Sequence, residues 1–190
     1  MSDSSGLRAI ASAFRLTGWI SFWTQLVLGV VSGGILLSAV VFSRGGNNSN
    51  NPGTGFGAFF AIAGLIALGV GIYLAFRYTR IGRQLDSSNP SNRPRKIETV
   101  QILQLALVVH LVGMLLTLLG AQAIAGTLIV KSLTLPQLGG VGVYTQIDPN
   151  RIIQPLDIFV VQANTNTVTA HFAGLVASIW LLNRISKPQP

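Results

Sequence analysis

Two histidines are the residues of this 190-residue chain best suited to chemistry, and both lie inside long apolar segments. His110 occurs in VQILQLALVVHLVGMLLTLLG and His171 in VQANTNTVTAHFAGL. Imidazole can bind a metal ion or carry a proton near neutral pH. An ionisable side chain within a membrane segment is a candidate functional residue by default. The chain has no cysteine, which excludes disulfides and thiolate metal sites.

A stripe of polar residues accompanies the second histidine. Asp157, Asn164 and His171 are seven residues apart, so a helix keeps them on one face within about 20 degrees. Thr167 falls close to the same face. Gln162 lies off this line and broadens the polar surface. The spacing therefore predicts one polar helix face rather than scattered polarity.

The segment around His110 has a matching stripe, in which Thr117 lies on the histidine's side. At about 1.5 Å per residue, both imidazoles lie near the membrane midplane if the two segments are antiparallel neighbours. Gln25, in the first apolar segment, reaches a comparable depth. Gln122 lies nearer the outer side, at a level where it could meet the amide of Gln162. We expect these groups to point inward, because an unpaired polar group facing lipid costs several kcal/mol.

Two interpretations of the polar interior remain open. The first is a polar transport pathway in which His110 and His171 bind a metal ion or carry protons. The second is interhelical hydrogen bonding that fixes the bundle, at about 0.6 kcal/mol per bond. Asp157 lies about 21 Å from His171 along the helix axis, so the two cannot bind one ion within a monomer. A histidine pair with Gln25 or Asn164 would hold a divalent ion weakly, as a transporter tolerates. We expect no bound cofactor, only a metal ion as transported cargo.

The composition indicates the elements that must position these groups. Only 9% of residues are charged, against about a quarter in soluble domains. A helix needs about 20 apolar residues to cross a bilayer. We predict an all-α integral membrane protein whose single domain, residues 1–190, crosses the lipid bilayer four times, at about 19–42, 56–76, 100–130 and 156–182. A short interfacial helix is expected at about 5–16.

The cations predict the orientation of these four segments. Of the 13 Lys and Arg residues, ten fall in the N-terminus, the loop at 77–98 and the C-terminus. Such an excess marks the cytoplasmic side. Both termini should therefore face the cytoplasm, or the stroma in a plastid. This placement explains the net charge of +8 without nucleic acid as a partner.

Small residues predict where the helices approach one another. Inside a bilayer, close backbone packing and polar bonds drive helix association, since lipid is as apolar as leucine. The spacing predicts a tight four-helix bundle or a self-associating surface. The candidate packing residues are Gly29 and Gly33 in the first segment, Ala63, Ala67, Gly71 and Ala75 in the second, and Gly113 and Gly120 in the third.

Motifs that would indicate an enzyme are absent. The sequence contains no HExxH, GxSxG or Walker loop, and no GxGxxG between a strand and a helix. We therefore expect a protein without catalytic residues.

Three segments carry a family resemblance: TGWISFWTQLVLGVVSGGILL, GAQAIAGTLIVKSLT and LDIFVVQANTNTVTAHFAGLVASIWLLNR. From about residue 9 to 184 the chain resembles a plastid and cyanobacterial tetraspan family, largely catalogued as a domain of unknown function. The family includes the small tetraspan subunit proposed for the Tic protein-import machinery of the chloroplast inner envelope, also described as a chloroplast iron permease.

The resemblance implies a multi-pass inner-membrane protein, with metal-ion (iron) transport as a permease or permease subunit favoured. A scaffold, assembly or protein-translocation subunit of a larger membrane complex is the alternative. It implies a cyanobacterial plasma or thylakoid membrane for this chain, and the chloroplast inner envelope for its plastid homologues. Four helices enclose a narrow pathway, so we expect a permease to be a homo-oligomer or part of a larger complex.

Overall fold

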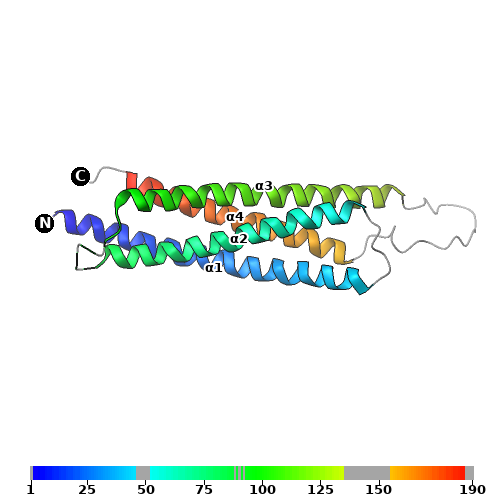
Figure 1. Cartoon of the computed structure of the whole chain (residues 1–190), viewed down its shortest axis with the longest axis horizontal. Helices are drawn as coiled ribbons and strands as arrows, with labels where there is room; N and C mark the ends of the chain where they lie inside the picture. The colour runs from blue at the N-terminus through cyan, green and yellow to red at the C-terminus, as the bar shows by residue number, and fades with distance from the viewer. Residues whose placement is uncertain are drawn as a thin grey trace, which may run out of the picture.

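The protein is a bundle of four long helices in a computed structural model that describes residues 2–45, 52–87, 89, 91, 93–134 and 155–186. The helices are α1 (Ser2–Gly45), α2 (Pro52–Leu85), α3 (Lys96–Thr134) and α4 (Pro155–Ser186). They run nearly parallel to one long axis (Figure 1). Each contains a stretch long and apolar enough to cross a membrane. The prediction of an all-helical fold with four helices able to span a membrane is confirmed for the described residues.

The helix ends follow the local sequence. Both α2 and α4 begin at a proline, which suits the first helical position because its missing N–H would be unpaired there anyway. Asp157 lies in the first turn of α4 and Arg184 in its last turn, which complements the helix dipole. The 44-residue α1 is about 66 Å long, more than twice the thickness of a bilayer core of about 30 Å. Its ends therefore extend beyond the hydrocarbon.

The segment at 5–16, for which a separate interfacial helix was predicted, is the beginning of α1. Ala11 and Phe14 are buried, and the Phe14 ring meets the edge of Tyr78 in α2 at a centroid distance of 6.4 Å. The helix continues because α2 extends far enough to cover these residues. Gly18 lets the two helices approach closely, since a β-carbon there would lie 2.9 Å from the Thr79 methyl group.

Each helix packs against two neighbours, which gives a four-cornered bundle. α1 contacts α2 and α4, and α3 contacts the same two helices, while α2 and α4 touch sparsely across the diagonal. The start of α1, the end of α4 and the connection from α2 to α3 lie at one end of the bundle, and the end of α3 and the start of α4 lie at the other (Figure 1). We call these the terminal end and the distal end.

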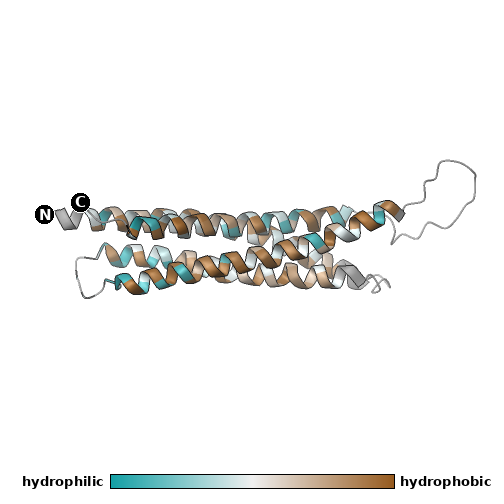
Figure 2. Ribbon diagram, turned by 90° about the horizontal axis from the view of Figure 1, so that it is seen from above, coloured by the Kyte–Doolittle hydropathy of each residue, from teal (hydrophilic) through white to brown (hydrophobic). Residues whose placement is uncertain are grey.

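Apolar side chains cover the outside of the bundle. Much of each helix is hydrophobic along its length (Figure 2), and large apolar side chains are exposed on every helix. The interior holds several buried polar side chains among its apolar ones, including Gln25, Asn164 and both histidines. This distribution suits a lipid environment, in which apolar surface costs nothing to expose and polar groups need internal partners.

A repeat of seven residues organises the contact between α2 and α3. Gly57, Gly64 and Gly71 are seven residues apart in α2, and a methyl group at any of them would overlap a side chain of α3. Those α3 side chains, in the same order, are Ile124, Thr117 and His110. A matched seven-residue repeat keeps two helices in register along a left-handed supercoil.

The backbones of α2 and α3 approach closely at Gly120. A β-carbon at this position would lie 2.9 Å from the backbone nitrogen of Ala61 and 3.0 Å from the carbonyl oxygen of Gly57. Neither backbone atom can move aside as a flexible side chain could. Gly126, six residues along the same helix, faces open space, with no atom within 4 Å of its β-carbon position.

We predict that Gly120→Ala lowers the free energy of unfolding by about 1–3 kcal/mol, because the new methyl group must push α2 and α3 apart. The matched control Gly126→Ala should leave stability unchanged or raise it by up to about 1 kcal/mol, since alanine favours a helix. Unfolding of the purified protein in mixed micelles, titrated with SDS, measures both. Equal effects of the two substitutions would contradict the packing described for Gly120.

Candidate functional site

The two histidines meet in the middle of the bundle, as the sequence predicts. His110 on α3 and His171 on α4 are both fully buried. Their Nδ1 atoms are 3.2 Å apart, and the rings meet edge to face with an angle of 69° between their planes. The Nε2 atom of His171 is also 3.1 Å from the carbonyl oxygen of Gly64 in α2. The pair therefore connects three helices by hydrogen bonds.

The hydrogen bonds assign a tautomer to each ring. A carbonyl oxygen only accepts, so His171 donates its Nε2–H to Gly64. With both rings neutral, His171 Nδ1 then carries a lone pair and accepts the Nδ1–H of His110. The remaining nitrogen, His110 Nε2, is left with a lone pair. The hydrogen bonds thus run from His110 through His171 to the Gly64 carbonyl on α2. His110 Nε2, at the beginning of this series, can accept a hydrogen bond.

Glycines on three helices make room for the two rings. A methyl group at Gly71 or Gly174 would overlap the His110 ring, and one at Gly113 would overlap the His171 ring. The two histidines therefore sit where neighbouring helices lack side chains. This arrangement explains how two imidazoles fit between helices packed at close distance.

Gln25 brings α1 into the same level of the bundle. Its Nε2 donates to Ser21 Oγ at 2.6 Å. Its Oε1 lies beside the position that a β-carbon of Gly71 would take, next to the His110 ring. Among the described residues this oxygen has no hydrogen-bond donor. We use the name histidine layer for Gln25, Gly71, His110, His171 and Gly174.

Asn164 lies seven residues from His171, toward the distal end, and is also buried. Its Nδ2 donates to the Val160 carbonyl at 3.1 Å. Its Oδ1 is the second buried side-chain oxygen for which the described part of the chain supplies no donor. The nearby hydroxyls are satisfied by their own helices: Thr167 donates to Ala163 and Thr117 to Gly113.

Two further interhelical contacts flank this polar interior. Toward the terminal end, Ser178 donates its hydroxyl to Gly174, so Tyr78 donates its own to Ser178 at 2.9 Å. Toward the distal end, Lys131 Nζ is 3.0 Å from Asp157 Oδ2. The sequence analysis placed Asp157 on the polar stripe without its ion-pair partner, and it missed both Tyr78 and Ser178. The seven-residue spacing could have indicated Ser178, which continues the stripe of His171.

Gln122 and Gln162 lie outside the buried interior. Both side chains are exposed on the outer surface, on α3 and α4 respectively. Gln162 Nε2 donates to Asn166 Oδ1 in its own helix at 3.0 Å. The candidate pathway residues that the structure does bury together are His110, His171, Asn164, Thr167, Thr117 and Gln25.

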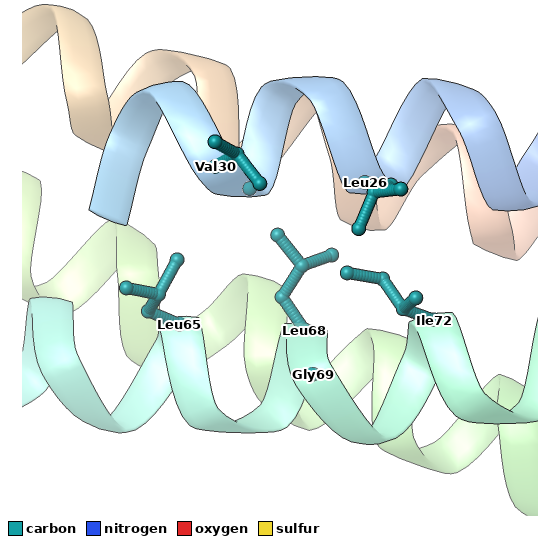
Figure 3. Close-up of a pocket in the computed structure, with 7 residues that line it drawn as sticks. Leu26, Val30, Leu65, Leu68, Gly69 and Ile72 are labelled. Carbon is teal, nitrogen blue, oxygen red and sulfur yellow. The ribbon is translucent and has the colours of Figure 1, made fainter. Parts of the chain in front are cut away.

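The small residues predicted to mediate packing occupy contacts of two kinds. Gly71, Ala75, Gly113 and Gly120 are buried, whereas Gly29, Gly33, Ala63 and Ala67 are partly buried. Gly29 faces the Leu68 side chain across the contact between α1 and α2. A small apolar groove of about 200 Å³ opens beside Gly29, lined on α1 by Leu26 and Val30 and on α2 by Leu65 and Leu68 (Figure 3). Its lining offers no polar side chain for an ion.

The histidine layer provides few ligands for a cation. In the part of the chain that the structure describes, no group of three or more His, Cys, Asp or Glu side chains could hold a metal ion. The layer offers two imidazoles and the amide oxygen of Gln25. Such a set of neutral nitrogen and oxygen ligands suits weak and reversible binding of a divalent ion.

Comparison with known proteins places the chain in a family. The family described as "Protein of unknown function (DUF3611)" matches residues 4–186. Protein TIC 21, chloroplastic, from Arabidopsis thaliana is 35% identical over 181 residues, which cover 92% of this chain. The chain spans 57% of the length of that relative. No solved structure matches significantly. This four-helix membrane protein, with its buried histidine pair, belongs to the DUF3611 family and is a relative of the Arabidopsis protein.

Proposed function

We propose that this protein is a permease, or a permease subunit, that passes a metal cation through the histidine layer, with iron(II) as the cargo. The surplus of buried hydrogen-bond acceptors supports this proposal. Gln25 Oε1 and Asn164 Oδ1 have no donor among the described residues. In the tautomers assigned to the histidine pair, His110 Nε2 also carries a lone pair.

A network that served only to hold the helices together would pair its donors and acceptors. An unsatisfied buried acceptor instead costs about 1–3 kcal/mol and strengthens no helix contact. A cation supplies what the surplus acceptors lack, because each can offer it a lone pair. Transport also requires that binding be weak enough for release. Two imidazoles and one amide oxygen meet that requirement better than a site with several carboxylates.

Passage of an ion requires a rearrangement of the histidine pair. In the resting arrangement the two Nδ1 atoms share one proton, 3.2 Å apart. If the rings separate, the lone pair of His171 Nδ1 becomes available together with that of His110 Nε2. The protein then acts by binding and positioning an ion, with no catalytic residue and no resident cofactor.

The distribution of cations supports an orientation for this permease. Arg15, Arg77 and Arg184 are exposed near the terminal end of the bundle, where most of the other Lys and Arg residues also lie. The positive-inside rule then orients this end toward the cytoplasm of a cyanobacterium or the stroma of a plastid. The plasma membrane and the thylakoid membrane both satisfy this orientation.

A second candidate function is a scaffold, assembly or protein-translocation subunit of a larger membrane complex. The tight packing of the interior supports it, because side chains and glycines fit together around both histidines. For this function the surplus acceptors would be occupied by water. The isolated protein would then transport nothing and would purify with large membrane partners.

We predict that liposomes containing the wild-type protein take up Fe²⁺. The flux through the double variant His110→Ala, His171→Ala should be lower by about tenfold or more. Removing groups that only support a metal ligand already costs 10- to 100-fold in affinity. A chelating fluorophore inside the liposomes measures the uptake.

The matched control for flux is Tyr78→Phe, which removes an interhelical hydrogen bond outside the histidine layer. It should keep most of the flux, because it leaves the histidine layer intact. Unchanged flux in the histidine double variant would remove both residues from the pathway. Absence of flux in the wild type would favour the scaffold function.

We predict that Gln25→Met and Asn164→Leu each leave the free energy of unfolding unchanged or raise it by about 1 kcal/mol. Each substitution removes an acceptor that has no donor, which offsets the loss of the one hydrogen bond that the amide donates within its own helix, and it keeps a side chain of similar size. His171→Leu should lower it, because it breaks the bonds to α2 and α3. SDS titration in mixed micelles measures all three. A loss of more than about 1 kcal/mol for both amide variants would mean that these oxygens are hydrogen-bonded in the protein.

Because the chain has no cysteine, single-cysteine variants can locate each end of the bundle. Ser91 in the connection between α2 and α3 and Ser132 near the end of α3 are both exposed. A membrane-impermeant maleimide added to intact cells should label Ser132→Cys and not Ser91→Cys. The reverse pattern would overturn the proposed orientation.

A further inference from the structure

A second group of polar side chains lies on the outside of α4. Gln162, Thr165 and Thr169 are exposed and Asn166 is half-buried. These four residues follow one side of the helix and form what we call the polar face of α4. They are separate from the histidine layer, which lies on the opposite side of the helix, toward the bundle interior.

The polar face lies at the depth of the hydrocarbon. Trp180 is exposed near the terminal end, where tryptophan commonly marks a membrane interface. The ion pair between Lys131 and Asp157 marks the distal end. From Trp180 to Thr169 is roughly 16 Å and to Gln162 roughly 27 Å along the helix, within a core of about 30 Å. The polar face therefore occupies the half of the core nearer the distal end.

The hydrogen bonds within α4 satisfy only part of this face. Thr165 donates its hydroxyl to Val161 and Thr169 donates to Thr165, so both hydroxyl protons are used. Gln162 Nε2 donates to Asn166 Oδ1. The described residues supply no donor to Gln162 Oε1 and no acceptor to the Nδ2 hydrogens of Asn166. In contact with acyl chains these groups would each cost several kcal/mol.

We propose that the polar face of α4 is the contact surface for a second copy of this chain, related by a two-fold axis along the membrane normal. Two copies inserted with the same topology present the same residues at the same depth. An amide has both donors and an acceptor, so Gln162 can pair with Gln162 of the second copy, and Asn166 likewise. A two-fold contact requires such a self-complementary surface.

The other helices offer no comparable surface at this depth in the described structure. On α3 the exposed residues around Gln122 are leucines and a glycine: Leu115, Leu118, Leu119 and Gly126. Gln122 is thus an isolated amide within an apolar surface. In contrast, α4 presents two amides one helical turn apart, next to Thr165 and Thr169. This contrast selects α4 and makes Gln122 the matched control.

Disulfide cross-linking in native membranes tests the location of the contact. The cysteine-free chain gives Thr165→Cys and Gln122→Cys a clean background. On mild oxidation Thr165→Cys should form a cross-linked dimer of this chain, and Gln122→Cys should stay monomeric. Equal or greater cross-linking through Gln122, or a cross-link only to a different protein, would overturn the proposal.

Dilution of the labelled protein into increasing amounts of lipid tests the hydrogen bonds themselves. The double variant Gln162→Leu, Asn166→Leu should weaken dimerisation by roughly tenfold, the effect of losing interhelical amide bonds. The control Gln122→Leu should dimerise as the wild type does. A wild type that is monomeric at every dilution would refute the dimer. Because the polar face lies outside the histidine layer, these results are independent of whether the protein transports a cation.

Discussion

The absence of water from the bilayer core determines how this bundle is built. A polar group there must find its partner within the protein, and only a close approach of two helices can bring one near. Glycines provide that approach. Gly71, Gly113 and Gly174 remove the side chains that would otherwise fill the space of the two imidazoles. The histidine pair and the glycines around it therefore depend on each other: without the glycines the rings cannot meet, and without the rings the glycines would leave cavities.

The absence of water from the bilayer core also explains why the inner and outer surfaces of the bundle differ. Inside, the hydrogen bonds from His110 through His171 to Gly64 tie α3 and α4 to α2, while Gln25 adds an acceptor from α1. The surplus of acceptors concentrates at and beside this level, which is where an ion would be held. Outside, the groove between α1 and α2 is lined only by apolar side chains and glycines, whereas α4 presents the polar face proposed to contact a second copy. A dimer through α4 would keep one complete histidine layer in each copy.

Much of this arrangement follows from the sequence. Segment length predicts the four helices, and the seven-residue spacing of Asn164 and His171 predicts that both point inward. The rotation of each helix about its own axis is harder to predict, because it depends on which neighbours it packs against. Gln162 was expected to join the interior and instead lies outside. The contact between Tyr78 and Ser178 involves residues 100 positions apart, which no local pattern indicates.

The nitrogen-15 spectrum of the two histidines, in protein reconstituted in lipid and labelled only at histidine, tests the central claim most directly. The chain has two histidines, so every imidazole signal belongs to one of them. The structure predicts one ring protonated at Nδ1 and the other at Nε2, with a coupling between the two Nδ1 atoms across their shared hydrogen bond. Two rings with the same tautomer and no such coupling would contradict the histidine layer described here.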